Sequence, residues 1–230
     1  MLFHNRQEAG AALAEALLHY QDLHPVVVGL PRGGIPVAAE IARRLSAPLE
    51  LIVARKIGCP WQPEYAIGAI APGVTVLNDA EISALGIRPD QLESTIARER
   101  HELARREAVY RKGRGPLDVR DRVVILVDDG LATGTTAIAA IKALRQLGPR
   151  RIIYAAPVCA PDSATTLGRH ADEVVCLRLP PRFRAVGLHY DDFTPTTDTE
   201  VLSCLEHAGS GGAPVAAGIE GGRPWSPQSC

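Results

Sequence analysis

The segment from Val123 to Thr136 constrains the fold of this chain more than any other. It opens with an unbroken aliphatic run, Val123–Val127, which predicts a buried parallel strand. Asp128 and Asp129 follow at the carboxyl end of that strand, and a loop rich in Thr and Gly then leads into a helix expected over 134–147. This order of strand, loop and helix is typical of a sheet whose faces are covered by helices.

The loop after this strand joins two kinds of binding group. Small residues let backbone N–H groups surround an anion, and the start of the next helix adds its positive end. Adjacent carboxylates accept hydrogen bonds from neutral hydroxyls or hold a cation. An ordinary turn is the alternative, but it does not explain two acids that repel each other without a partner. We therefore expect a sugar phosphate, with its phosphate bound by Ala132, Thr133, Gly134, Thr135 and Thr136.

This motif resembles the phosphoribosyl diphosphate (PRPP) motif of type I phosphoribosyltransferases. The resemblance implies an α/β fold with a central, mostly parallel sheet flanked by helices and a small variable hood. It covers residues 1–206, and the chain looks most similar to uncharacterised bacterial phosphoribosyltransferase-domain proteins, through the segments 63–70 and 190–193. Residues 207–230, rich in Gly, Pro and Ser, are expected to form a disordered tail.

Periodicity predicts the remaining elements. Apolar runs predict core strands, and apolar residues at helical spacing predict helices. Gly and Pro predict an irregular segment over 55–66, and a second irregular segment is expected over 180–195. The expected strands are 26–30, 49–54, 151–158 and 173–178, with a short pair at 67–70 and 74–77, and the expected helices are 6–20, 36–45, 90–112, 162–170 and 197–206.

A second binding loop is expected after the first strand, at Arg32, Gly33 and Gly34. Ligands of open α/β sheets bind at the carboxyl edge of the strands, and the planar fork of an arginine matches phosphate oxygens. The resemblance implies that this is the pyrophosphate-binding loop, which in the family often holds a cis non-proline peptide, expected here near Arg32–Gly33. A Gly-rich turn with a solvent-facing arginine is the alternative.

Arg55 and Lys56 follow the second strand, where two cations suit a diphosphate. The pair resembles the Arg-Lys pair before the flexible loop of orotate and adenine phosphoribosyltransferases, which implies that 57–66 form a lid; a surface cationic pair is the alternative. The loop position of Ala132 resembles that of adenine phosphoribosyltransferases, whereas 6-oxopurine phosphoribosyltransferases carry an acid at this position. Glu64 in the lid is therefore the candidate acid or base, unless it is a plain surface carboxylate.

The acceptor hood is expected from parts of 72–115 and 180–195. Phe183, Tyr190 and Phe193, with His189, are candidates to stack on an acceptor ring, although packing roles are the alternative. The charges of the helix over 90–112 predict a solvated face rather than a functional basic stripe.

Composition excludes several classes of function. Hydrophobic residues make up 46% of the chain, enough for a large core, and a net charge of −1 argues against nucleic acid bound through bulk charge. The five scattered cysteines form no metal-ligand pattern and fit a reducing cytoplasm. No apolar run reaches membrane-spanning length, and we expect no membrane partner.

The resemblance implies a reaction in which ribose 5-phosphate moves from PRPP to a base or amine, with release of pyrophosphate. Mg²⁺ would be the cofactor, held on the diphosphate and contacted by Asp128 and Asp129 through water. A homodimer is common in the family. One alternative is a PRPP- or nucleotide-sensing regulator on the same fold. Another, a diphosphokinase that makes PRPP, would need an ATP site in a longer, duplicated chain.

Overall fold

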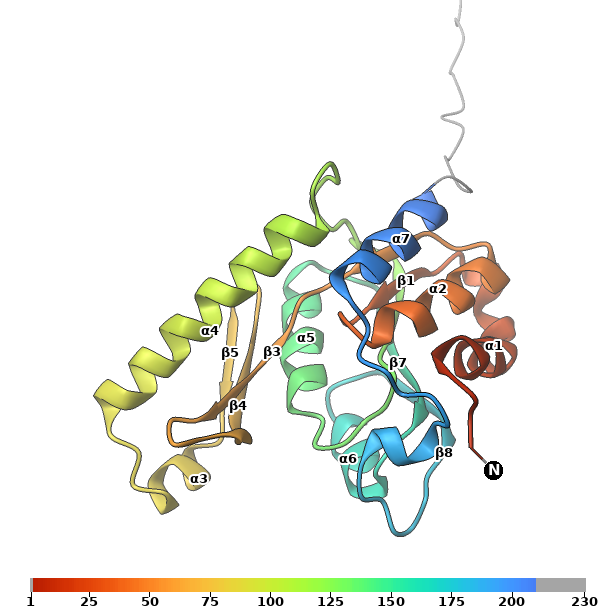
Figure 1. The fold of residues 1–230 in the computed structure, drawn as a ribbon. Coiled ribbons are helices and arrows are strands. Elements are labelled where there is room, and N and C mark those ends of the chain that lie inside the picture. Colours follow the sequence, from red (N-terminus) through yellow and green to blue (C-terminus); the bar gives the residue numbers. More distant parts are fainter. Residues whose placement is uncertain (1, 210–230) are drawn as a thin grey trace, which may run out of the picture.

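The computed structural model describes residues 2–209 and contains a central sheet of five parallel strands (Figure 1). These strands are β1 (Val26–Gly29), β2 (Leu49–Leu51), β6 (Val123–Val127), β7 (Arg151–Val158) and β8 (Glu173–Arg178). Their order is β2-β1-β6-β7-β8. Gly29 of β1 lies opposite both Leu51 and Val127, so the carboxyl ends of three neighbouring strands lie side by side.

Helices cover both faces of the central sheet because its strands are apolar on both sides. In β6, Ile125 and Val127 belong to one core, whereas Val124 and Leu126 belong to a second core on the other face. The first face is covered by α1 (Arg6–Leu17), α2 (Gly34–Leu45) and α7 (Asp198–Gly209), and the second by α5 (Thr135–Gln146) and α6 (Pro161–Leu167).

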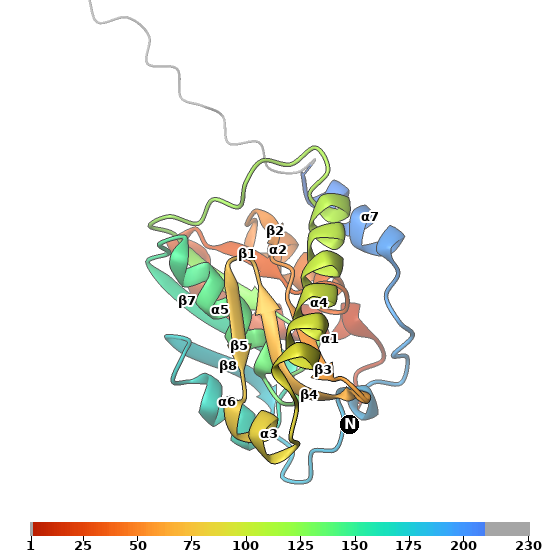
Figure 2. The same ribbon diagram turned by 90° about the vertical axis from the view of Figure 1, so that its left-hand side faces the viewer.

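A separate antiparallel sheet of three strands packs on the outer side of α5. Its order is β3 (Arg55–Cys59), β4 (Gln62–Ala71) and β5 (Val74–Leu77). Ala69 and Ala71 join the core of α5, whereas Ile57 joins the core of α4 (Pro89–Tyr110) through Leu103. Figures 1 and 2 show the resulting layers, from α4 through the small sheet and α5 to the central sheet. The short helix α3 (Asp79–Ala84) connects β5 to α4.

The expected irregular segment over 55–66 is instead the β3–β4 hairpin, so that prediction is wrong. Its Gly and Pro fit the hairpin rather than break it, because the register shifts on both sides of Gly58. A Cβ atom on Gly58 would lie 2.2 Å from the carbonyl oxygen of Pro63. Pairing with a neighbouring strand thus overrides the local signal. Closure of 57–66 as a lid stays a prediction.

The other predicted elements are present with shifted ends. The predicted strands at 151–158 and 173–178 are confirmed, whereas the second core strand ends at Leu51 rather than at 54. The expected first helix is divided into α1 and a 3₁₀ helix over Leu18–Leu23, and a second 3₁₀ helix, Val186–His189, lies in the segment 180–195. Helix α7 continues to Gly209, beyond the predicted boundary at 206. The rest of the predicted tail, 210–230, lies outside the described residues.

Hydropathy gives one further result. Within residues 2–209, none of the helices combines the length and the apolar character needed to cross a bilayer.

Candidate functional site

The candidate site lies where the chain order of the central sheet reverses. From β1 the chain turns to β2 on one side, whereas β6, β7 and β8 follow on the other. The loop after β1 and the loop after β6 therefore leave the sheet side by side, joined by the hydrogen bond that Leu30 N donates to Val127 O over 2.9 Å. Such switch points bind ligands in open α/β sheets.

Hydrogen bonds to neighbouring segments fix the loop between β6 and α5. Leu131 N donates to Val158 O and Ala160 N to Leu131 O, which anchors the loop to the end of β7. The hydroxyl of Ser163 donates to the carbonyl of Ala132. Gly134 has a φ of 77°, the left-handed region that favours glycine. The first N–H groups of α5, from Thr135 and Thr136, have no partner within a helix and are suited to a phosphate.

Asp128 and Asp129 lie at the base of this loop with their carboxylates enclosed by protein. Burial, followed by the negative charge of Asp129, raises the pKa of Asp128 well above its usual range. Burial also raises the pKa of Asp129, although the charge of Arg6 opposes the effect. Two acids in such surroundings gain stability from hydroxyl donors or from a cation, which is consistent with a polyol or metal-bound ligand.

Arg6 of α1 is a site residue that the sequence analysis missed. Its Nε donates to Asp129 Oδ2 over 2.8 Å, and the two side chains are only 10% and 14% exposed. The guanidinium also donates to the Thr194 carbonyl and lies 3.9 Å from the centre of the Phe193 ring. The position of Arg6 in its helix could have revealed this role. Arg6 occupies the first turn of a helix, where the helix dipole disfavours a cation, so it needs an acidic partner.

Among the predicted stacking residues, Tyr190 contacts Asp129 directly, and each ring packs against another aromatic ring. Tyr190 is 5% exposed, and its hydroxyl donates to the carbonyl of Asp129 over 2.6 Å. Its ring lies against Phe3 and Phe193, while Phe183 stacks on His189. These contacts brace the motif from the side of α1. A stacking role on an acceptor stays a prediction for Phe183, Tyr190 and Phe193.

The loop after β1 approaches the acidic pair without room for side chains. A Cβ atom on Gly33 would lie 2.0 Å from Asp129 Oδ2, and one on Gly34 would lie 2.7 Å from the carbonyl oxygen of Val127. The cis peptide bond of this loop joins Pro31 to Arg32, one bond before the expected position. The two glycines therefore let the expected pyrophosphate loop touch the expected ribose-binding acids.

Replacing Gly33 by alanine is expected to disturb the site through side-chain contact alone. The backbone of Gly33 has a φ of −61°, which alanine adopts without strain. The new methyl group must displace Asp129 and should destabilise the fold by about 1–3 kcal/mol while weakening the binding of PRPP. Gly115→Ala is the matched control, since nothing lies within 4 Å of its added Cβ. Thermal unfolding and calorimetric titration measure both effects; equal behaviour of the two variants would contradict this packing.

Arg32 is held in place from the opposite side of the loop. Its guanidinium lies 3.8 Å from Asp198 Oδ1 at the start of α7, and both side chains are about 40% exposed. Tyr110 at the end of α4 donates its hydroxyl to the same oxygen over 2.6 Å. Burial and this hydrogen bond raise the pKa of Tyr110 to about 12. The loop after β1, α4 and α7 therefore meet at Asp198.

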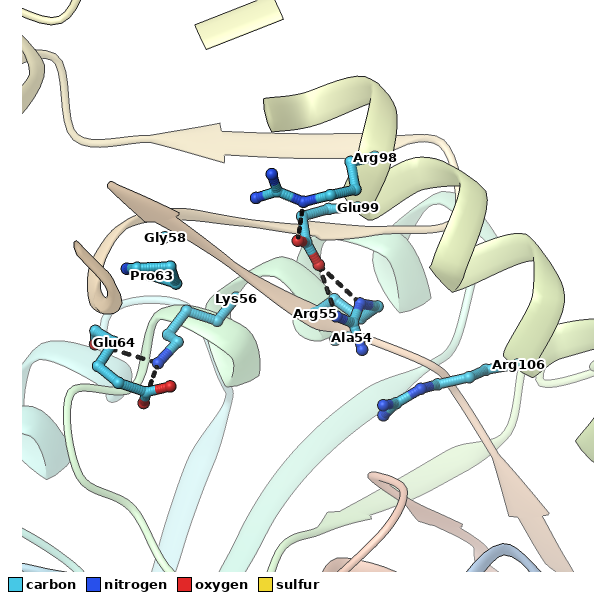
Figure 3. A pocket seen from close by; sticks show the side chains of 9 residues that line it. All are labelled: Ala54, Arg55, Lys56, Gly58, Pro63, Glu64, Arg98, Glu99 and Arg106. Carbon is cyan, nitrogen blue, oxygen red and sulfur yellow. Dashed lines mark hydrogen bonds and ion pairs between the residues drawn. The ribbon is translucent and has the colours of Figure 1, made fainter. Parts of the chain in front are cut away.

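The predicted residues Arg55, Lys56 and Glu64 line one cleft on the small sheet (Figure 3). Its volume is about 330 Å³. Lys56 Nζ lies 3.0 Å from Glu64 Oε2, an ion pair in which the Glu64 side chain is 95% exposed. Arg55 donates two hydrogen bonds to Glu99 Oε2 on α4, over 2.9 and 2.6 Å. The structure thus brings these three predicted residues together.

Helix α4 is more than the solvated face expected from its charges. Arg98, Glu99 and Arg106 line the same cleft, and the sequence analysis missed them. The spacing of residues along α4 could have revealed Glu99. It lies four residues from both Thr95 and Leu103, which are buried, so its carboxylate also faces inward and requires a cation. Arg55 supplies that cation.

Asp128 and Asp129 are the residues of this site that could contact a metal ion. Within residues 2–209, no group of three or more His, Cys, Asp or Glu side chains could hold a metal by itself. Two carboxylates at the mouth of the expected phosphate-binding loop nevertheless match Mg²⁺, which proteins commonly bind through one or two carboxylates together with substrate phosphates. The residues present therefore fit a metal that arrives with a phosphorylated substrate.

Comparison with known proteins agrees with this geometry. The family model of the phosphoribosyl transferase domain matches residues 2–192. A Mycobacterium tuberculosis protein named "putative phosphoribosyl transferase" is 42% identical over 90% of this chain and 47% of its own length. The crystal structure of TT1426 from Thermus thermophilus superposes with a TM-score of 0.74 at 42% identity, covering 90% of this chain and 99% of that one.

A more distant match is the uracil phosphoribosyltransferase of Campylobacter concisus, 31% identical over 127 residues, which are 55% of this chain and 51% of that enzyme. The chain belongs to the phosphoribosyl transferase family. It spans about half the length of the curated relatives named here.

Proposed function

We propose that this chain transfers ribose 5-phosphate from PRPP to a nitrogenous acceptor and releases pyrophosphate. The observation that carries the proposal is the convergence of two loops at the switch point of the sheet, one with paired acids before a phosphate-binding helix start, the other with Gly33 against Asp129. Family membership supports a transferase.

The proposed contacts follow the charge and shape of PRPP. Its 5-phosphate would bind the backbone and hydroxyl groups of 132–136, and its ribose hydroxyls would bind Asp128 and Asp129. Its diphosphate would extend toward Arg32 and the cations Arg55 and Lys56. Negative charge grows on the diphosphate as the bond to the ribose breaks, and fixed cations in a partly enclosed cleft stabilise that charge.

Mg²⁺ is proposed as the cofactor, carried on the diphosphate and contacted by Asp128 and Asp129 through water. When bound, it would neutralise part of the charge of the leaving group. The remaining work falls to the protein. Arg6 keeps Asp129 oriented, and the loop after β1 lies against the same carboxylate.

Glu64 is proposed to handle the proton of the acceptor, because Ala132 cannot. Its side chain is exposed at the cleft, so an incoming ring nitrogen could reach the carboxylate that now pairs with Lys56. A carboxylate within hydrogen-bond reach of the nucleophile is the geometric requirement for general acid–base catalysis. Movement of the β3–β4 hairpin over the bound substrates would exclude water and protect PRPP from hydrolysis.

A screen for pyrophosphate release tests the proposal. The protein is incubated with PRPP, Mg²⁺ and, in turn, purines, pyrimidines and amines that are not nucleobases. Pyrophosphate released with one acceptor class is the expected result, and adenine alone would agree with Ala132, whereas hypoxanthine or guanine would contradict that assignment. PRPP binding without release for any acceptor would favour a sensor, and no PRPP binding would overturn both readings.

A further inference from the structure

Helix α4 forms one wall of the cleft, and its Arg106 is a cation to which the proposed contacts give no role. Arg55, Lys56, Arg98 and Arg106 line the cleft, opposed by the carboxylates of Glu64 and Glu99. Cations therefore exceed acids around this opening, which favours an anionic occupant. In Figure 3, Arg106 extends from α4 apart from the other side chains of the cleft, whereas Arg98 lies beside Glu99.

Of the two α4 arginines that line the cleft, Arg106 is the more buried. Its side chain is 22% exposed, against 60% for Arg98. Its Nε donates to Glu102 Oε1 over 2.9 Å, and that bond leaves the two terminal nitrogens of the fork for another acceptor. Glu102 is itself fixed by Arg105, which donates over 2.6 and 2.9 Å. The guanidinium of Arg106 is thus oriented before any ligand arrives.

Arg106 also lies near the loop after β1. It precedes Tyr110 by one turn of α4, so the two side chains lie on the same face of the helix. Tyr110 in turn donates to Asp198, the partner of Arg32. Arg32 comes from the central sheet and Arg106 from α4, so the two cations approach this junction from two different layers of the molecule.

We propose that Arg106 is a substrate-binding residue that contacts the diphosphate of PRPP from the α4 side, opposite Arg32. The assignment rests on the proposed function and adds a residue from outside the sheet-edge loops. The terminal nitrogens of an arginine match two oxygens of a phosphate group, and such charge-assisted bonds are about twice as strong as neutral ones. Glu102 positions the fork and so lowers the entropic cost of binding.

Calorimetric titration with inorganic pyrophosphate and Mg²⁺ tests this assignment. Arg106→Gln should weaken the binding of pyrophosphate by about tenfold or more, the loss expected for a charged hydrogen bond. Arg100→Gln is the matched control, because Arg100 lies on the same helix and hydrogen-bonds Thr75 but does not line the cleft; the affinity of this variant should stay within about twofold of the unchanged protein. Arg106→Lys keeps a point charge and should recover part of the affinity.

The outcomes separate this inference from the function on which it rests. If the unchanged protein binds pyrophosphate or PRPP and Arg106→Gln binds equally well, the Arg106 assignment is overturned and the proposed function stands. Equal losses in Arg100→Gln and Arg106→Gln would also overturn it, because they would reflect the general charge of α4. Failure of the unchanged protein to bind either ligand would overturn both.

Discussion

Replacing Asp128 and Asp129 together by asparagine is expected to weaken PRPP binding at least about a hundredfold, since each carboxylate loses charge-assisted hydrogen bonds worth about 1.5–3 kcal/mol. The neutral amides should also lose the contact with Mg²⁺ carried by the substrate. The fold should survive, because an amide oxygen can still accept the hydrogen bond from Arg6 and because the two carboxylates no longer repel each other, although Arg6 loses the charge of its partner.

Calorimetric titration with PRPP and Mg²⁺ measures this effect, and circular dichroism checks the fold. Asp121→Asn is the control, since Asp121 is exposed just before β6, at the end of the strand opposite the acidic pair. Its φ of 57° is one that asparagine tolerates. An affinity for PRPP that is unchanged in the Asp128/Asp129 double variant would contradict the assignment of these acids to the ribose.

Arg6→Ala is expected to lower the free energy of unfolding by about 3 kcal/mol, because removing one member of a buried ion pair leaves the other charge uncompensated. The carbonyl of Thr194 also loses its donor, and the Phe193 ring loses its cover. PRPP affinity should fall as well, since Asp129 loses the contact that orients it. The expected drop in melting temperature is roughly 10 °C for a domain of this size.

Thermal unfolding tests this prediction against Arg44→Ala. Arg44 of α2 pairs with Glu15 of α1 over 2.8 Å, but the side chains are 47% and 58% exposed. The loss of such a surface pair should cost less than about 1 kcal/mol. Equal stability of the two variants would mean that the Arg6–Asp129 contact contributes little. A double-mutant cycle with Asp129→Asn would then give the coupling energy directly.

The sequence reveals the parts of the site that are local along the chain. The aliphatic run of β6 and the acids and small residues after it lie within one short segment, so a pattern of residues is enough to predict strand, loop and helix. The two glycines after β1 are visible in the same way. Their meeting with the acids follows from the parallel sheet, since adjacent parallel strands present their carboxyl ends at one edge.

The parts that the sequence analysis missed depend on contacts between distant segments. Arg6 meets Asp129 across more than half of the chain, and neither residue shows its partner by spacing. The β3–β4 hairpin forms although Gly58 and Pro63 read locally as breaks, because its strands pair with each other and pack on α4 and α5. In α4, Glu99 faces inward although most of the surrounding residues are charged, and its partner, Arg55, lies in β3.

A crystal structure of the protein grown with PRPP and Mg²⁺ would show where each part of the substrate binds. We expect the 5-phosphate at the backbone of 132–136, the ribose hydroxyls within hydrogen-bond distance of Asp128 or Asp129, and the diphosphate between Arg32 and the cleft of the small sheet. A ligand bound at any other part of the molecule, or a ribose that does not reach the acidic pair, would contradict this expectation.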